Sequence, residues 1–392
     1  MKTESAVPTN PTHPTGSKRG DMKPTSRTIG RGWLAVSADW STPLLLSGIV
    51  LMAVALMSVL GFGRTGVEAL IMLVAVVGLH AYSGVTGIAT FGHVGFMAIG
   101  GYVATLLTLP AVVKSYRLPG LPAWLAGTEM DPYLALVVVY ACGVVAAGVF
   151  GLLIWRLNGL AAGISTLAFL LVTYNVTSGW EDVTGGRGAV PGVPQISDTA
   201  PALVVALLAI WATAWFGRTR QVRMARAARE DEAAAHAIGI RVHLGRWVAM
   251  TFSGGVMALA GGLYVYFVGS ISPDFFYVPM MFSLLTFLVV GGMTSLTGAV
   301  VGTLAVQLLR QLLEPLDRGW DVAGIAFDGR PGLRFVVLGL LTLLVLAKRP
   351  GGLVNGFEIR LPMRRKGSHA EQSAQAATTT SVSLANNSAL QR

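Results

Sequence analysis

Long stretches without a single acidic or basic side chain constrain this chain more than any other feature of its sequence. The sequence has no acidic or basic residue from Ser41 to Phe62, from Pro132 to Trp155 or from Pro201 to Gly217. The hydrocarbon core of a bilayer is about 30 Å thick, and a helix needs roughly 20 apolar residues to cross it. The three stretches are of that order, so the sequence predicts an integral membrane protein.

The hydropathy pattern predicts an all-α fold, a polytopic bundle of about ten transmembrane helices. The predicted spans cover residues 42–62, 67–83, 88–109, 132–155, 159–179, 199–216, 247–269, 276–290, 295–313 and 332–347. Glycine interrupts one or two of these helices, most visibly between Gly84 and Gly95 and between Gly291 and Gly302. The polar ends predict a disordered N-terminal arm (1–40) and a disordered C-terminal tail (356–392) around a transmembrane domain (41–355).

The basic residues predict the orientation of the bundle. With ten spans and an inner N-terminus, the inner segments hold 21 of the 29 Lys and Arg residues and the outer segments hold 6. Lys and Arg accumulate on the cytoplasmic side of membrane proteins, so both termini are predicted to be cytoplasmic. The same placement explains the net charge of +10 without a nucleic-acid partner, because the sequence offers no soluble basic face.

The longest inner loop, residues 217–246, has a composition that favours helix. One continuous helix would place four arginines toward its positive N-terminal end, whereas two short helices avoid this. Asp231 would cap the second helix, Glu232 would occupy its first turn, and Gly239 would end it. From its chemistry the loop is equally consistent with a docking element for a cytosolic protein and with an arginine-rich topology anchor.

Two sequence motifs resemble motifs of a known permease family. Glu232-Ala233-Ala234 followed by Gly239 resembles the coupling loop of ABC importer permeases. The run from Gly84 to Tyr102 resembles the glycine-rich signature of branched-chain amino acid permeases of the LivM type, and further matches extend the resemblance over roughly residues 45–355. The chain departs from that pattern at Ile88, Thr90, Thr294, Thr297 and His80, which leaves the substrate open.

The resemblance implies the membrane-spanning permease of an ABC importer in a bacterial inner membrane. An outer solute-binding protein would capture branched-chain or related hydrophobic amino acids, a second permease of the H type would complete the channel, and two cytosolic ATPases would drive it. The residues implied in coupling to the ATPases are Glu232, Ala233, Ala234 and Gly239. The residues assigned to the pathway or gate are Gly84, Thr86, Gly87, Thr90, Gly92, His93, Gly291 and Gly292. Alternatively, the glycines serve only close helix packing.

The sequence holds no G-x-x-x-x-G-K-[ST] motif, no zinc-ligand spacing and no plausible catalytic triad, so neither an enzyme nor a cofactor is predicted. His80 and His93 could relay protons, although a histidine bonded to a neighbouring carbonyl is the more common arrangement. Three alternatives stay open: a urea or short-amide ABC permease, an ion-coupled secondary transporter, and a membrane scaffold without transport. The scarcity of acids within the spans counts against the second alternative.

Overall fold

A computed structural model of the protein describes residues 40–196, 198–314, 317, 320–322, 325–327, 332–349, 351–354 and 358. The predicted arm (1–40) and tail (356–392) lie outside the described residues, apart from Trp40 and Glu358.

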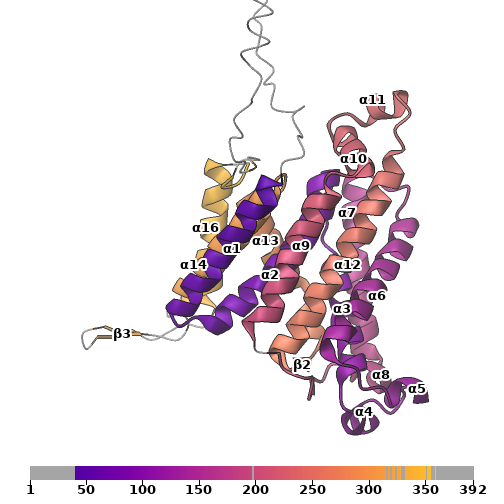
Figure 1. The fold of residues 1–392 in the computed structure, drawn as a ribbon, viewed down its shortest axis with the longest axis vertical. Coiled ribbons are helices and arrows are strands. Elements are labelled where there is room, and N and C mark those ends of the chain that lie inside the picture. The colour runs from indigo at the N-terminus through magenta and orange to yellow at the C-terminus, as the bar shows by residue number, and fades with distance from the viewer. Residues whose placement is uncertain are drawn as a thin grey trace, which may run out of the picture. The chain divides into compact units, whose positions relative to one another are not determined.

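Helices make up almost all of the described secondary structure (Figure 1). The long helices are α1 (Ser41–Val59), α2 (Gly63–Thr86), α3 (Val94–Thr108), α6 (Pro132–Leu153), α7 (Gly159–Gly179), α9 (Thr199–Phe216), α12 (Val242–Val268), α13 (Val278–Gly291), α14 (Leu296–Leu312) and α16 (Leu333–Lys348). The short helices are α4 (Ala111–Arg117), α5 (Ala123–Ala126), α8 (Glu181–Thr184), α10 (Arg220–Glu230), α11 (Glu232–Ala237) and the 3₁₀ turn η1 (Pro273–Phe276). The predicted all-α class is confirmed.

Two small antiparallel strand pairs were not predicted. β1 (Val190–Pro191) pairs with β2 (Ser270–Ile271), and β3 (Trp320–Val322) pairs with β4 (Ile325–Phe327). Strands of two or three residues carry no period-2 pattern that a sequence could reveal.

Each of the ten predicted spans corresponds to one long helix. By length and composition, seven of these helices are able to cross a membrane when α13 is counted with η1, and α3 becomes an eighth when it is counted with α4 across a 117° bend. The shorter α14 and α16 leave the count of ten as a prediction. The third predicted span began at residue 88, whereas α3 begins at Val94 because residues 87–93 leave the helical path.

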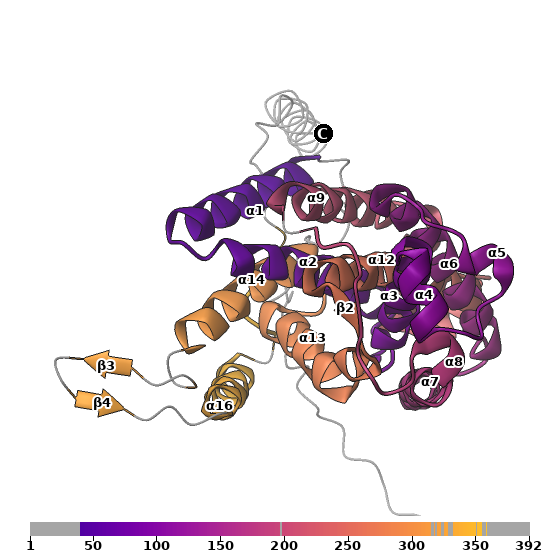
Figure 2. The same ribbon diagram turned by 90° about the horizontal axis from the view of Figure 1, so that it is seen from below.

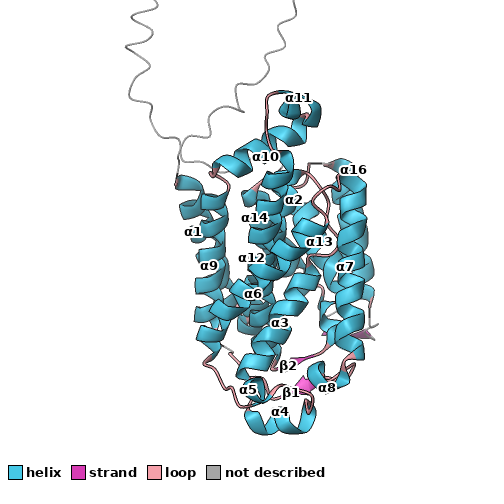
Figure 3. Ribbon diagram, turned by 90° about the vertical axis from the view of Figure 1, so that its right-hand side faces the viewer, coloured by secondary structure: helices cyan, strands magenta, loops and turns pink. Residues whose placement is uncertain are grey.

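The long helices form three layers around a buried centre. α1 and α9 lie on one side, α2, α12 and α14 in the middle, and α7, α13 and α16 on the other side, while α3 and α6 flank α12 (Figures 2 and 3). Every residue in the most apolar 18-residue window of α2 is buried, compared with 22% in α7. Of the helices long and apolar enough to cross a membrane, α2 is therefore the most enclosed.

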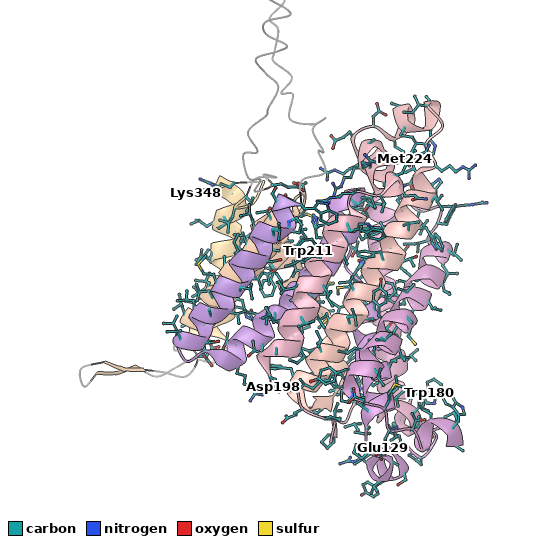
Figure 4. All side chains as sticks on the ribbon, viewed as in Figure 1. Glu129, Trp180, Asp198, Trp211, Met224 and Lys348 are labelled. Carbon is teal, nitrogen blue, oxygen red and sulfur yellow. The ribbon has the colours of Figure 1, made fainter. Side chains whose placement is uncertain are left out.

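The two ends of the bundle differ. α10 and α11 extend beyond the long helices at one end, called the α10 end below, whereas α4, α5 and α8 lie at the opposite end (Figure 3). Met224 and Lys348 mark the α10 end, and Glu129, Trp180 and Asp198 lie toward the opposite end (Figure 4). The arginine-rich α10 and the acids Glu129 and Asp198 therefore lie on opposite sides of the apolar helices.

Candidate functional site

Two helix interruptions meet at the α10 end of the bundle. The first break (residues 87–93) begins where α2 ends at Gly87, whose φ of 73° is a left-handed conformation that glycine adopts without steric cost. The second break (residues 292–295) separates α13 from α14. His80 Nδ1 donates to Met293 O at 3.0 Å and joins them, because the ring stands on α2 and the carbonyl lies in the second break.

Hydroxyl groups organise the first break. Thr86 Oγ1 donates to Tyr82 O at 2.9 Å and accepts from Ile88 N at 3.2 Å. Thr90 Oγ1 is hydrogen-bonded to His93 Nδ1. Thr86 and Thr90 are 5% and 1% exposed, so in this conformation both hydroxyls support the turn from within the protein.

The far side of the first break rests on α7. Phe91 N donates to Thr166 Oγ1 at 3.1 Å, and the same hydroxyl donates to Gly163 O at 2.6 Å. A Cβ on Gly92 would lie 1.6 Å from Thr166 O, so only a residue without a side chain fits there. The closeness of the two backbones makes the position of the first break depend on α7.

The two intramembrane histidines are both buried. His80 bonds a neighbouring carbonyl, as the sequence favoured over a proton relay. His93 lies between the rings of Tyr82 and Phe96, at centroid distances of 5.2 and 5.6 Å. Its Nε2 has no hydrogen-bond partner within the described part of the chain. This packing favours a structural role for His93.

The second break is held by close backbone contact. A Cβ on Gly291 would lie 2.0 Å from Gly298 O, and Gly302 approaches the same point. Ser295 Oγ accepts from Gly298 N at 3.0 Å and caps α14. Gly292 marks the turn, where its N–H still donates to Leu288 O at 2.9 Å. The absence of side chains at these glycines therefore permits the close backbone packing seen here.

The basic loop forms two helices, as predicted from its charge pattern. α10 ends at Glu230, and Asp231 caps α11 by accepting from Ala234 N at 2.9 Å. Gly239 follows α11, where its N–H donates to His236 O at 3.0 Å. A small apolar cluster attaches this unit to the start of α12 through Ala228, Ala235 and Val242, with Ile240 packed against it.

Glu232 points back into the protein rather than outward. Arg246 Nη2 donates to Glu232 Oε2 at 2.9 Å and Nη1 donates to Oε1 at 3.2 Å. Asn158, in the connection between α6 and α7, donates to Oε1 at 3.3 Å and also accepts from Arg246. The hydrogen bonds from Arg246 lower the pKa of Glu232 below its ordinary value, with partial burial as a smaller opposing effect.

The outer face of α11 is left apolar by this arrangement. Ala233, Ala234 and Ala237 are exposed, and Ile238 is 77% exposed. The exposed side chains of α11 are thus mainly small and apolar, with Ile238 as the large one. Of the coupling residues implied by the sequence, Glu232 holds the helix in place, and the two alanines lie on its free face.

Arg229 is a site residue that the sequence did not single out. Its Nη1 donates to Gly84 O at 3.2 Å, although 145 positions separate the two residues. A Cβ on Gly87 would lie 2.7 Å from Cγ and Cδ of Arg229, so the stem of the side chain lies directly over the start of the first break. No signal in the sequence distinguishes Arg229 from the other arginines of α10.

The polar residues of α7 divide between two environments. Thr166, Thr173 and Thr177 are buried, as expected for an inward polar face, whereas Asn175 is exposed. Tyr174 OH donates to Asp274 at 2.9 Å. α7 therefore combines an inward threonine face with polar groups near its end opposite α10.

A shallow hollow, partly open to solvent, lies beside the Glu232–Arg246 pair. Its lining includes Tyr82, Trp155, His243, Arg246 and Trp247. In the described part of the chain, no group of three or more His, Cys, Asp or Glu residues is arranged to hold a metal ion.

The amino-acid sequence is similar to that of a known family of membrane proteins. The sequence profile of the family described as branched-chain amino acid transport system / permease component matches residues 62–346. The high-affinity branched-chain amino acid transport system permease protein LivM of Escherichia coli (strain K12) is 23% identical over 88% of this chain and 83% of its own length. A probable branched-chain amino acid transport permease protein LivM of Methanocaldococcus jannaschii is 26% identical over 74% of this chain and 91% of its own length. No solved structure matches.

Proposed function

Because the chain belongs to the family of branched-chain amino acid transport system permease components, we propose that it is the membrane-spanning permease of an ABC importer. Its solute would be a branched-chain or related hydrophobic amino acid, the class that the relatives' names give. Urea or a short amide is the second candidate. The departures from the family signature at Ile88 and Thr90 lie within the first break, where the pathway is proposed.

The observation that carries this proposal is the form of α10 and α11. They extend beyond the long helices (Figure 1) and present the apolar face of α11 to water. The exposed Ile238 could be covered by a partner, because buried side chains near the centre of an interface contribute most of its binding energy. An ATPase subunit with an apolar groove is the partner that an importer permease requires at this point.

The charge distribution supports an α10 end that faces the cytoplasm. Arg220, Arg223 and Arg241 are exposed there, whereas Glu129 and Asp182 are among the acids of the opposite end. Basic residues accumulate on the cytoplasmic side of membrane proteins, so both termini are proposed to be cytoplasmic. The opposite end, with α4, α5 and α8, would then meet the outer solute-binding protein.

Three connections would transmit motion from the ATPase to the helices. A displacement of α11 would act on α12 through the Glu232–Arg246 pair and on the α6–α7 connection through Asn158. It would also move α10, because only Asp231 separates the two short helices. A second permease subunit, of the H type, would complete the pathway, and the solute would be selected mainly by the outer binding protein.

The arrangement counts against an ion-coupled transporter. Proton- and ion-coupled carriers place ionisable groups within the membrane to carry the ion. Among the described residues of α2, the one acid is Glu68 near its start, and it lies 3.9 Å from Arg310 of α14.

Copurification tests this proposal. The full chain, extracted in mild detergent from the cells in which it is native, is expected to carry an ATPase of the ABC type with vanadate-sensitive hydrolysis of Mg-ATP. Replacing Ala233 and Ala234 together with aspartate should remove that activity while the yield of the chain stays constant. The proposal would be overturned if the chain were found without an associated ATPase both in native membranes and after purification in detergent.

A further inference from the structure

We propose that Arg229 is a positioning residue that holds the first break closed at the α10 end, so that movement of α10 opens it. The inference rests on the proposed transport function for its purpose, but the contact itself is a property of this chain. It assigns to Arg229 a task distinct from that of Glu232, which attaches α11 to α12.

The acceptor of the contact is an incomplete helix end. The final carbonyls of a helix lack intrahelical donors. At the end of α2, Gly87 N donates to Ser83 O at 2.9 Å. The next donor in the chain, Ile88 N, turns to Thr86 Oγ1 instead, so Gly84 O receives no such bond and accepts from Arg229. A cation at a helix C-terminus is also favoured by the helix dipole.

The side chain of Arg229 is partly buried against the end of α2. Its exposed fraction is 28%, whereas Arg220 and Arg223 of the same helix lie exposed. The stem fits over Gly87 because glycine leaves the space free, and any Cβ there would collide with it. The stem of Arg229 therefore packs against Gly87 at the start of the first break, and its guanidinium binds the end of α2.

The contact is also placed where motion would break it. Arg229 stands next to the last residue of α10, three positions before α11 begins. Its neighbour Glu230, 58% exposed, lies 3.6 Å from the guanidinium. When α10 moves away from α2, Glu230 keeps a carboxylate beside Arg229, which lowers the cost of releasing Gly84 O.

Loss of the bond between Arg229 and Gly84 O would leave the first break attached on one side only. The first break is held between Arg229 on one side and Thr166 of α7 on the other. Without Arg229, the segment around Ile88 keeps only its attachment to α7 and its own turn. The expected result is that Ile88 and Thr90, which are buried here although Gly87 and Ala89 are exposed, open toward the α10 end.

Thiol labelling of the chain alone tests this. Cys142 is the only native cysteine, so a Cys142→Ser chain with Ile88→Cys reports the opening of the first break, because Ile88 is 6% exposed. A membrane-impermeant maleimide is applied to vesicles of both orientations. Arg229→Met should raise the labelling rate of position 88 about tenfold, as expected when a hydrogen bond to a charged group is lost. Arg229→Lys should give an intermediate rate.

Matched variants distinguish loss of the Arg229 contact from a general destabilisation of the helix bundle. Gly87→Ala should mimic Arg229→Met, because the added Cβ displaces the stem, whereas Arg223→Met should leave the rate unchanged. Ala75→Cys, at the buried centre of α2, should stay unlabelled in every variant. Equal rates at position 88 in the parent, Arg229→Met and Gly87→Ala would overturn the proposal, and so would labelling of position 75 together with position 88. The assay uses neither solute nor ATPase, so its outcome is independent of the copurification test.

Discussion

Glu232 and Arg246 form a two-pronged ion pair that ties the first turn of α11 to the first turns of α12, with Oε2 and Nη2 2.9 Å apart. The glutamate of the coupling motif is therefore engaged inside the chain. The free face of α11, with Ile238, is left to meet a partner. In this account the motif separates two tasks, because one residue positions the helix and others make the contact.

Exchanging the charges of this pair tests its positioning role. The Glu232 side chain is 34% exposed, so the pair is expected to contribute about 1 kcal/mol or less to the local stability of α11. Glu232→Arg alone should increase amide hydrogen exchange in α11 several-fold. Adding Arg246→Glu should restore most of the protection, because the attraction is recovered with reversed sign. Protection that is unchanged in the single variant would contradict this role.

The pH dependence of α11 follows from the lowered pKa of Glu232. A carboxyl group whose pKa is lowered by folding stabilises the fold fully above its ordinary pKa, about 4.3 for glutamate, and loses that contribution as the pH falls through the lowered value. A spin label at position 237 should therefore keep constant mobility from pH 8 to pH 5 and become more mobile only below about pH 4. Glu232→Gln should remove this acid transition. A transition near pH 6 that persists in Glu232→Gln would assign the effect to other groups.

Ile238 is expected to anchor the partner ATPase. Buried apolar anchors of interfaces typically contribute 2 kcal/mol or more, which is roughly a 30-fold change in affinity. Ile238→Glu should abolish copurification of ATPase activity, and Ile238→Ala should reduce it. Ala227→Glu provides a charge-matched control at an exposed position of α10. Equal loss of activity in Ala227→Glu and Ile238→Glu would show that added charge, rather than the anchor, matters.

Gly92 is expected to be the glycine of the first break that tolerates replacement least. A Cβ there would lie 1.6 Å from a backbone carbonyl of α7, which cannot move aside as a side chain could. Overpacking of this kind costs about 1–3 kcal/mol or more, so Gly92→Ala should lower the thermal midpoint measured in detergent. Gly48→Ala on α1 meets nothing within 4 Å and should leave the midpoint unchanged or slightly raised. Similar midpoints for the two variants would contradict the close packing of the first break on α7.

The sequence predicted the fold well, because membrane helices carry strong local signals. Hydropathy located each of the ten long helices among the described residues, and glycines marked the first break, whereas Gly298 and Gly302 lie inside regular α14. The split of the basic loop at Asp231 was also predictable, since capping and the helix dipole act between neighbouring residues.

The long-range contacts that define the site could not be predicted from the sequence. Arg229 binds a backbone carbonyl 145 positions away, and a carbonyl leaves no mark in a sequence because every residue has one. The pairing of Glu232 with Arg246 and Asn158 likewise depends on how α6, α7 and α12 meet. Sequence patterns could name the motif, but only the packing shows which of its residues face inward.

Reconstitution in liposomes tests the central claim most directly, namely that a separate ATPase acting on α11 supplies the energy. Vesicles with the copurified assembly and an outer solute-binding protein should accumulate labelled leucine only when ATP is present on the α10 side, and Ile238→Glu should abolish accumulation. Vesicles with the chain alone should accumulate none, under an ion gradient or without one. Accumulation by the chain alone would contradict the account.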